Sequence, residues 1–329
     1  MFKYVHQLIG AASLLCTLTL LSPHGARAEK INILGGQSGA TWSIIASSYA
    51  NCISKATDGK AQVTVLLGSG LSNPIRLDRG DADVALVTSS AIFQAINGLG
   101  PYKKKLENFA ALCSLCDDMN FQIVVPADSP YTSLREIVEK KMPVRINHGT
   151  KGTGAEQLIR EVMQYYGASW NDVRSWGGRV YANSFQDGAG LFKDGVVDMF
   201  IWNGPGELGL ITEMSLSRKL RWLPLDDDAN ARLTSLLGTK KGFLAASMYN
   251  NAVARDTPTA SDTQGLYVRK DISDETAYFL TKTWIENIEE IAYAYPGLKK
   301  FSPEKAIADL GVPLHPGAAR YYKERGWLK

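Results

Sequence analysis

Short apolar runs of strand length alternate along the chain with longer stretches in which apolar residues recur at helical spacing. The first such pair is a strand at residues 31–34, a turn at 35–39 and an amphipathic helix over 40–56. The plan repeats, with strands expected at 62–67 and 83–87 and the helices that follow them at 73–79 and 91–97. This alternation predicts an open parallel sheet, in which the turns after the strands gather at one edge and form the usual ligand site.

Later segments continue the alternation and suggest a second sheet. Strands are expected at 111–115, 121–125, 198–202, 221–225 and 262–268, and helices at 134–140, 185–192 and 274–291. A break at 128–130 marks the expected passage into a second lobe. The prediction is an α/β protein of two lobes joined by a hinge, each lobe a mostly parallel sheet flanked by helices. Its expected parts are residues 29–125 (first lobe), 126–221 (second lobe) and 222–329 (return to the first lobe and C-terminal helices).

Residues 1–28 have the pattern of a secretory signal peptide. Lys3 supplies a positive charge, an apolar run covers 8–21, and Ala26-Arg27-Ala28 fits the cleavage site. Leu15 before Cys16 argues against a lipoprotein signal, and no later stretch is long and apolar enough to cross a membrane. The sequence therefore predicts a soluble protein exported to the periplasm, and we expect a monomer.

Charge and length narrow the class of protein. Loss of Lys3 and Arg27 with the signal lowers the formal net charge from +3 to +1, so the sequence offers no basic patch for nucleic acid. The full sequence is 45% hydrophobic, and the chain that remains after the signal is long enough for two cores.

The cysteines leave two alternatives open. Cys113 and Cys116 could form a local disulfide in an oxidising compartment, or they could be small buried residues like Cys52. Three cysteines without neighbouring histidines make a poor zinc site. We expect no metal and no cofactor.

A glycine-rich turn at 147–157 is the main candidate for ligand binding. Gly149, Gly152 and Gly154 lie between a short strand and a helix, where unpaired N–H groups attract an anion, and Lys151 and Thr153 add a cation and a hydroxyl. The glycine spacing fits neither a dinucleotide fingerprint nor a Walker loop. A plain helix-capping turn is the alternative, but capping accounts for one glycine rather than three.

Catalytic motifs are weak. The stretch 36–39 lacks the spacing of a nucleophile elbow, and the mature chain has only His148 and His315. His148 either contacts a ligand or bonds a neighbouring backbone carbonyl, and the acids at 226–228 read as a solvated turn rather than a calcium site. Trp176, Trp202 and Tyr249 line a cleft or fill a core. We expect a binding protein rather than an enzyme.

Several segments together carry a family resemblance. They are 33–39 (ILGGQSG), 70–77 (GLSNPIRL), 80–87 (GDADVALV), 149–154 (GTKGTG), 192–198 (FKDGVVD), 273–276 (SDET) and 312–318 (VPLHPGA). In order and spacing, the chain resembles the TAXI-family solute-binding proteins of TRAP transporters, which are similar to type II periplasmic binding proteins. The resemblance implies capture of a small anionic solute, an organic acid or a glutamate-like amino acid, between two lobes, with TRAP membrane permease subunits as partners. A periplasmic module that presents its ligand to a membrane sensor is the alternative.

One departure from the family pattern bears on the ligand. Ser89-Ser90 stands where members often have an acid, which would remove a partner for an amino group and favour a ligand without an ammonium. The expected ligand-binding residues are Gly36, Thr41, Asn73, Thr88, Ser89, Lys151, Gly152, Thr153, Gly154, Trp202 and Asn203.

Overall fold

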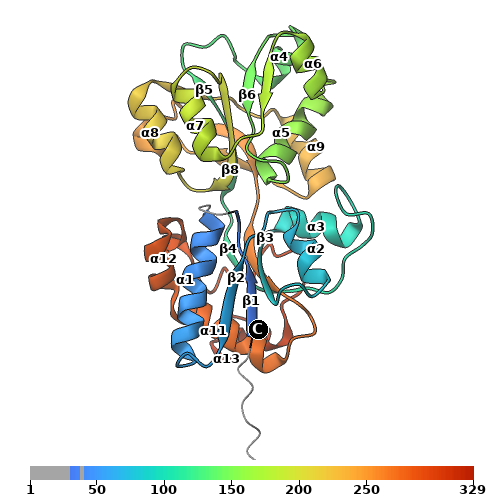
Figure 1. Ribbon diagram of the computed structural model, residues 1–329, viewed down its shortest axis with the longest axis vertical. Coiled ribbons are helices and arrows are strands. Elements are labelled where there is room, and N and C mark those ends of the chain that lie inside the picture. Colours follow the sequence, from blue (N-terminus) through green and yellow to red (C-terminus); the bar gives the residue numbers. More distant parts are fainter. Residues whose placement is uncertain (1–29, 38–40) are drawn as a thin grey trace, which may run out of the picture.

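A computed structural model describes residues 30–37 and 41–329. Figure 1 shows two lobes, one above the other, each built on a five-stranded sheet with helices on both faces. The expected two-lobed α/β fold is therefore confirmed. Both sheets are mixed, because each contains one strand that runs antiparallel to its neighbours. The expected signal peptide at 1–28 lies outside the described residues, as does part of the first glycine turn. Among the described helices, none is both long and apolar enough to cross a membrane.

The first lobe contains the sheet β2-β1-β3-β12-β4. Its strands are β1 (Lys30–Leu34), β2 (Gln62–Leu66), β3 (Val84–Thr88), β4 (Ala110–Cys116) and β12 (Gln264–Val268). The strand β1 is parallel to β2 and β3, whereas β12 runs antiparallel between β3 and β4. Because side chains alternate along each strand, Val84 and Leu86 enter one core while Ala85 and Val87 enter the core on the opposite face.

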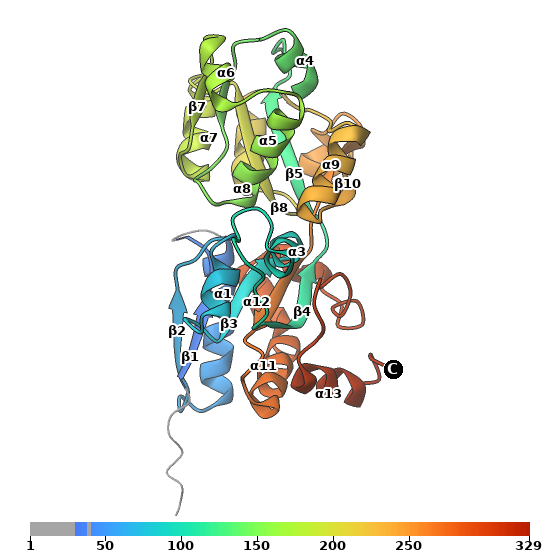
Figure 2. The same ribbon diagram turned by 90° about the vertical axis from the view of Figure 1, so that its right-hand side faces the viewer.

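Helices cover both faces of this sheet (Figures 1 and 2). On one face lie α1 (Thr41–Ala56), α11 (Asp274–Glu286), α12 (Ile288–Ala294), the 3₁₀ helix η1 (Pro296–Lys300) and α13 (Pro316–Glu324), and on the other lie α2 (Asn73–Asp78) and α3 (Ser89–Asn97). The single helix expected over 274–291 is in fact two, since it ends at Asn287, whose side chain bonds the Thr283 carbonyl at 2.8 Å and whose φ and ψ of −113° and 18° are not helical.

The second lobe repeats the strand order. Its sheet is β7-β6-β8-β5-β9, formed by β5 (Met119–Pro126), β6 (Arg145–Asn147), β7 (Arg179–Tyr181), β8 (Met199–Pro205) and β9 (Leu220–Trp222). Here β6 is parallel to its neighbours β7 and β8, and β5 is antiparallel to β8 and β9. In each sheet the fourth strand in this order, β12 in the first lobe and β5 in the second, is the first strand that the chain forms after it crosses from the other lobe.

The remaining elements pack around the second sheet. They are α4 (Leu134–Glu139), α5 (Gly154–Tyr165), α6 (Trp170–Ser175), α7 (Phe185–Lys193), α8 (Gly209–Ser217), α9 (Asp227–Leu237), α10 (Met248–Asn251) and the antiparallel pair β10 (Lys240–Leu244) and β11 (Thr257–Ser261). Residues of α5 and α9 fill the core on one face of the sheet, and residues of α7 and α8 fill the core on the other.

The chain passes between the lobes at positions that differ from the sequence expectation. The first passage is at 117–118, because β5 already pairs in the second sheet, so the expected boundary after residue 125 is wrong. The return is at 262–263 rather than near 222, because β9 pairs with β5 and Leu225, Leu233 and Ala260 all belong to a second-lobe core. The two passages lie side by side, with Met119 N–H 3.2 Å from the Asp262 carbonyl and Asp262 N–H 3.1 Å from the Met119 carbonyl.

Cys52, Cys113 and Cys116 are free thiols, so the local disulfide alternative is not formed in this structure. Cys52 and Cys113 are buried in the first-lobe core, and burial raises the pKa of the Cys113 thiol. A thiol that remains protonated is a poor nucleophile, which fits a packing role.

Candidate functional site

A cleft of about 510 Å³ opens between the two lobes. Its lining combines small polar residues with a few large apolar ones, and it draws on the ends of strands in both sheets. The expected site residues that line it are Gly36, Thr41, Thr88, Thr153, Gly154, Trp202 and Asn203. Asn73, Ser89, Lys151 and Gly152 do not line it.

Helix N-termini from both lobes reach this cleft. Thr41 and Trp42 begin α1 in the first lobe, while Gly154 and Ala155 begin α5 in the second. Phe185 starts α7 and also lines the cleft. Since the first N–H groups of a helix have no intrahelical partner, three helices offer donors to a bound group from opposite sides.

The glycine-rich turn contributes Thr153 and Gly154 to the cleft but not Lys151. Thr153 is the N-cap of α5, where its Oγ accepts from Glu156 N–H at 3.3 Å and donates to the Thr150 carbonyl at 2.9 Å. Gly149 and Gly152 have φ of 78° and 81°, a region that disfavours side chains. A Cβ at Gly154 would lie 2.9 Å from Asn203 Nδ2, so this glycine is needed for close packing beside the cleft. Lys151 is exposed on the outside of the turn.

Asn73 is a structural residue rather than a ligand contact. It is fully buried, and its Nδ2 donates to the carbonyls of Gly35 and Leu86, both at 2.9 Å. Its Oδ1 accepts from Ser69 N–H at 2.9 Å. The amide thereby ties together the chain at the ends of β1 and β2 and a carbonyl within β3. Its hydrogen-bonding groups are already used, which explains why the expected ligand role is not supported.

The serines after β3 hold a carboxylate that the sequence analysis missed. Ser89 Oγ donates to Asp262 Oδ1 at 2.8 Å, and Ser90 donates to the same side chain through its N–H (3.1 Å) and its Oγ. Thr88 caps α3 through Ala91 N–H at 3.3 Å. The start of α3 is therefore occupied by side chains of the protein itself, and Ser89 serves Asp262 rather than the cleft.

Asp262 is 3% exposed and lines the cleft where the two passages between the lobes meet. Burial raises the pKa of this carboxyl, while the hydrogen bonds from Ser90 and Ser89 act in the opposite direction. Among the described residues that line the cleft, Asp262 is the sole ionisable side chain. No motif marks it, because it follows β11 directly and its partners lie more than 170 residues earlier in the chain.

Hydrogen bonds also join the lobes around the cleft. Gln157 Nε2, from α5, donates to Gln94 Oε1 of α3 at 2.7 Å, and Gln94 Nε2 lies 3.4 Å from Gln157 Oε1. Gln37 Nε2 donates to Thr150 Oγ1 at 2.7 Å. Near them α3 packs against α9, as Figure 1 shows on the right-hand side of the molecule. These contacts describe a conformation in which the lobes touch.

The aromatic candidates divide between core and cleft. Trp202 is 6% exposed, lines the cleft and packs in a second-lobe core. Tyr249 is buried beneath α8, where its hydroxyl donates to Gln122 Oε1 at 2.9 Å. Trp176 packs at the edge of the other second-lobe core, away from the cleft lining.

The histidines and the acidic run have structural partners. His148 is buried, places Nδ1 2.9 Å from the Gly149 carbonyl and stacks on Trp170, so the carbonyl alternative holds. His315 caps α13 by accepting from Gly317 N–H at 3.3 Å. Asp226 caps α9 and pairs with Arg135 at 2.9 Å. Within the described residues, no cluster of acids, histidines or cysteines has the arrangement of a metal site.

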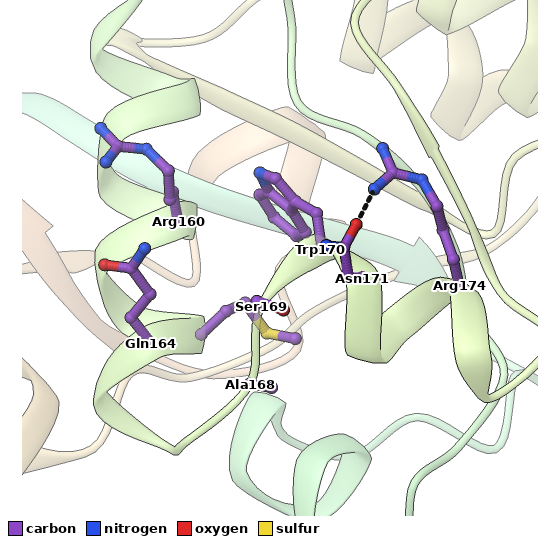
Figure 3. A pocket seen from close by; sticks show the side chains of 8 residues that line it. Arg160, Gln164, Ala168, Ser169, Trp170, Asn171 and Arg174 are labelled. Carbon is purple, nitrogen blue, oxygen red and sulfur yellow. Dashed lines mark hydrogen bonds between the residues drawn. The ribbon is translucent and has the colours of Figure 1, made fainter.

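A second hollow of about 290 Å³ lies between α5 and α6 (Figure 3). Its two arginines already have partners: Arg160 pairs with Glu156 at 3.0 Å and Glu161 at 3.1 Å, and Arg174 donates to Asn171 Oδ1 at 3.1 Å. Because these cations are engaged and the hollow belongs to one lobe, the cleft between the lobes is the better candidate site.

Comparison with known proteins agrees with this architecture. A model of the NMT1-like family matches residues 33–326, and the chain belongs to that family. Among solved structures, MatC from Rhodopseudomonas palustris with bound malate has a TM-score of 0.54 at 10% identity, over 91% of this chain and 97% of that one.

Two further binding proteins are also similar. A binding protein component of an ABC phosphonate transporter from Pseudomonas aeruginosa has a TM-score of 0.48 at 13% identity, over 92% of this chain and 96% of that one. The periplasmic aliphatic sulphonate binding protein SsuA from Escherichia coli has a TM-score of 0.43 at 14% identity, over 90% and 83% of the two chains. The likeness to MatC shows a shared fold, and at 10% identity it leaves the ligand open.

Proposed function

We propose that this protein is a periplasmic solute-binding protein of the TAXI type, which captures a small carboxylate-bearing solute between its lobes and delivers it to a TRAP-type membrane permease. The observation that carries the proposal is the cleft of about 510 Å³, which is lined by the first residues of helices from both lobes. Its size suits a small solute, and helix N-termini suit a carboxylate.

Neutral donors would hold the carboxylate. No lysine, arginine or histidine side chain lines the described part of the cleft, so the N–H groups of α1, α5 and α7 and the hydroxyl of Thr41 would supply the hydrogen bonds. Lys151 is exposed beside the turn and would act at most as a weak, screened charge. The proposed contacts are Gly36, Thr41, Thr88, Thr153, Gly154, Trp202 and Asn203.

A binding role also accounts for the arrangement of the lobes. Two adjacent passages, paired through Met119 and Asp262, form a narrow connection about which the lobes can rotate as rigid bodies. Contacts such as Gln37 with Thr150 form only when the lobes meet, so a solute held from both sides would favour the closed form. We propose a binding role and no catalytic role.

The test begins with the ligand. The protein purified from the periplasm should release a small acid on denaturation, identified by mass spectrometry, and the stripped protein should bind that acid in calorimetry with compaction seen by small-angle scattering. Binding without compaction would refute the closure mechanism. Release of a neutral solute or a cation lacking any acid group would refute the carboxylate assignment.

The transport partner needs a separate measurement. Proteoliposomes containing the TRAP permease should accumulate the solute only when the loaded protein is added. Uptake that instead requires an ATP-binding cassette permease would refute the TRAP assignment. Stimulation of a membrane sensor in place of uptake would support the sensing alternative.

A further inference from the structure

Two side chains at the cleft, Asp262 and Asn203, have oxygen atoms that could each accept a further hydrogen bond. The first acceptor belongs to Asp262. Its Oδ1 accepts three hydrogen bonds, from Ser89 Oγ, Ser90 N–H and Thr263 N–H, at 2.8, 3.1 and 2.8 Å. Its Oδ2 accepts one, from Ser90 Oγ. Because a carboxylate oxygen has two lone-pair directions, Oδ2 retains one of them.

The charge of Asp262 has no counter-ion beside it. All four of its hydrogen bonds come from neutral donors, and the other described residues that line the cleft carry no charge. The donors orient the carboxylate and favour its ionised form, but burying an anion without a cation is costly. A cationic group of the ligand beside Oδ2 would offset that cost.

The second acceptor belongs to Asn203 on the opposite lobe. Its Oδ1 is buried and has no hydrogen-bond partner among the described residues, although Asn203 lines the cleft. Buried polar atoms without partners are uncommon in folded proteins, and one at a cleft wall indicates a donor supplied by the ligand. This observation is independent of Asp262 and calls for the same ligand chemistry.

We propose that Asp262 determines specificity by receiving a protonated nitrogen of the solute, with Asn203 as a further acceptor from the second lobe. The inference rests on the proposed carboxylate-binding function and deepens it: the ligand carries both a carboxylate and a cationic nitrogen. The sequence predicted a ligand without an ammonium, because Ser89 and Ser90 stand where an acid was expected. The structure instead places the carboxylate of Asp262 at these serines, so the site does contain a partner for a cationic nitrogen.

The position of Asp262 links this recognition to closure. Its backbone pairs with Met119, which also lines the cleft, so a ligand nitrogen at Oδ2 lies against the connection between the lobes. The ligand therefore needs a cationic nitrogen at one end, to bind Asp262, and a carboxylate at the other end, to bind the helix N-termini. A dicarboxylate without nitrogen would set a second negative charge near Asp262 and bind poorly.

Matched pairs of acids test this on the wild-type protein. Calorimetry compares L-norvaline with pentanoate and L-aspartate with succinate, each pair differing in one ammonium group. In every pair that binds, we expect the amino member to bind about tenfold to a hundredfold more tightly, the range of one charge-assisted hydrogen bond. Equal or tighter binding of the member without nitrogen overturns the inference and leaves the proposed function intact.

The variant D262N completes the test. It keeps an acceptor while removing the charge, so the preference for the amino member should disappear, and binding of the nitrogen-free acid should stay equal or improve. A preference that survives in folded D262N overturns the role of Asp262. Should D262N not fold, the wild-type pairs and the chemical identity of the co-purified solute still decide: a solute without basic nitrogen refutes the inference, and a solute without an acid group refutes the proposed function itself.

Discussion

Gln94 and Gln157 form a reciprocal amide pair across the cleft, one side chain from α3 of the first lobe and the other from α5 of the second. Both are nearly inaccessible, at 0% and 4% exposure. Gln157 lines the cleft and Gln94 does not, so the pair connects the ligand-facing surface to a contact that exists only when the lobes meet.

Removing this pair should weaken ligand binding without touching the ligand directly. Gln94→Ala deletes two hydrogen bonds specific to the closed form, which at about 1 kcal/mol each contribute about 2 kcal/mol together and correspond to a loss of up to about thirtyfold in affinity. Calorimetry measures the affinity and small-angle scattering the degree of closure. Asn97→Ala, on the exposed side of the same helix, is the control and should leave both unchanged. Unchanged affinity in Gln94→Ala would show that the pair does not contribute to closure.

Asn73 should matter for stability rather than for binding. Asn73→Ala removes two donors and one acceptor from a fully buried position and should lower the free energy of unfolding by about 2 to 4 kcal/mol. Asn73→Asp should cost at least as much, because it turns a carboxylate oxygen toward the carbonyls of Gly35 and Leu86. Urea denaturation measures both, with the exposed Asn171→Ala as control. A stable Asn73→Asp variant that has lost ligand binding would contradict this assignment.

Gly154 should be sensitive to a single methyl group. In Gly154→Ala the new Cβ would lie 2.9 Å from Asn203 Nδ2 and displace that side chain at the cleft wall, so we expect affinity to fall by about tenfold or more. Stability should change by less than about 1 kcal/mol, since alanine suits a helix better than glycine. The matched control is Gly190→Ala in α7, where the added Cβ has open space. Equal effects of the two substitutions on affinity would refute close packing at Gly154.

Lys151 offers a test of long-range charge. Its side chain is exposed and outside the cleft lining, so Lys151→Met should change affinity for an acid by less than about twofold at physiological salt. Titrations at low and physiological ionic strength separate a screened charge from a direct contact. A loss of tenfold or more that persists at high salt would place the lysine on the ligand.

His148 should make stability depend on pH. Burial lowers its pKa in the folded protein below the ordinary value of 6.5, so the unfolded chain takes up a proton first as the pH falls. The stabilisation is complete above pH 6.5 and is lost as the pH decreases toward the folded-state pKa. Urea denaturation at a series of pH values measures the slope, and His148→Gln should flatten it. An equal slope in that variant would assign the pH dependence to other groups.

Local patterns in the sequence predicted most elements but not the lobe to which each strand belongs. The apolar run of β5 fits either sheet equally well, and its place is decided by pairing with β8, some 80 residues later. The lobe of β9 could not be predicted either, because this strand has three residues and is too short to show a periodic pattern. Segment type is a local property, whereas strand partnership depends on contacts that the pattern does not encode.

The site was predictable to the extent that it follows from strand ends. Thr88, Thr153 and Asn203 lie where polar residues follow or end strands, and the structure brings them to one cleft. Asn73 was expected to contact the ligand because it follows the turn after β2, yet its amide is directed to the carbonyls of Gly35 and Leu86. The role of Asp262 could not be predicted from the sequence, because its hydrogen-bond partners Ser89 and Ser90 lie far away in the chain.

The insertion of β12 between β3 and β4 has a consequence for how the chain acquires its structure. The second lobe occupies one continuous stretch and can fold as soon as that stretch is available. The first lobe lacks the strand between β3 and β4 until residues 264–268 arrive, since β3 and β4 meet only through β12. In vectorial synthesis or export, the N-terminal half therefore waits with two unpaired strand edges exposed while the middle of the chain matures, a period in which aggregation and chaperone binding compete with folding.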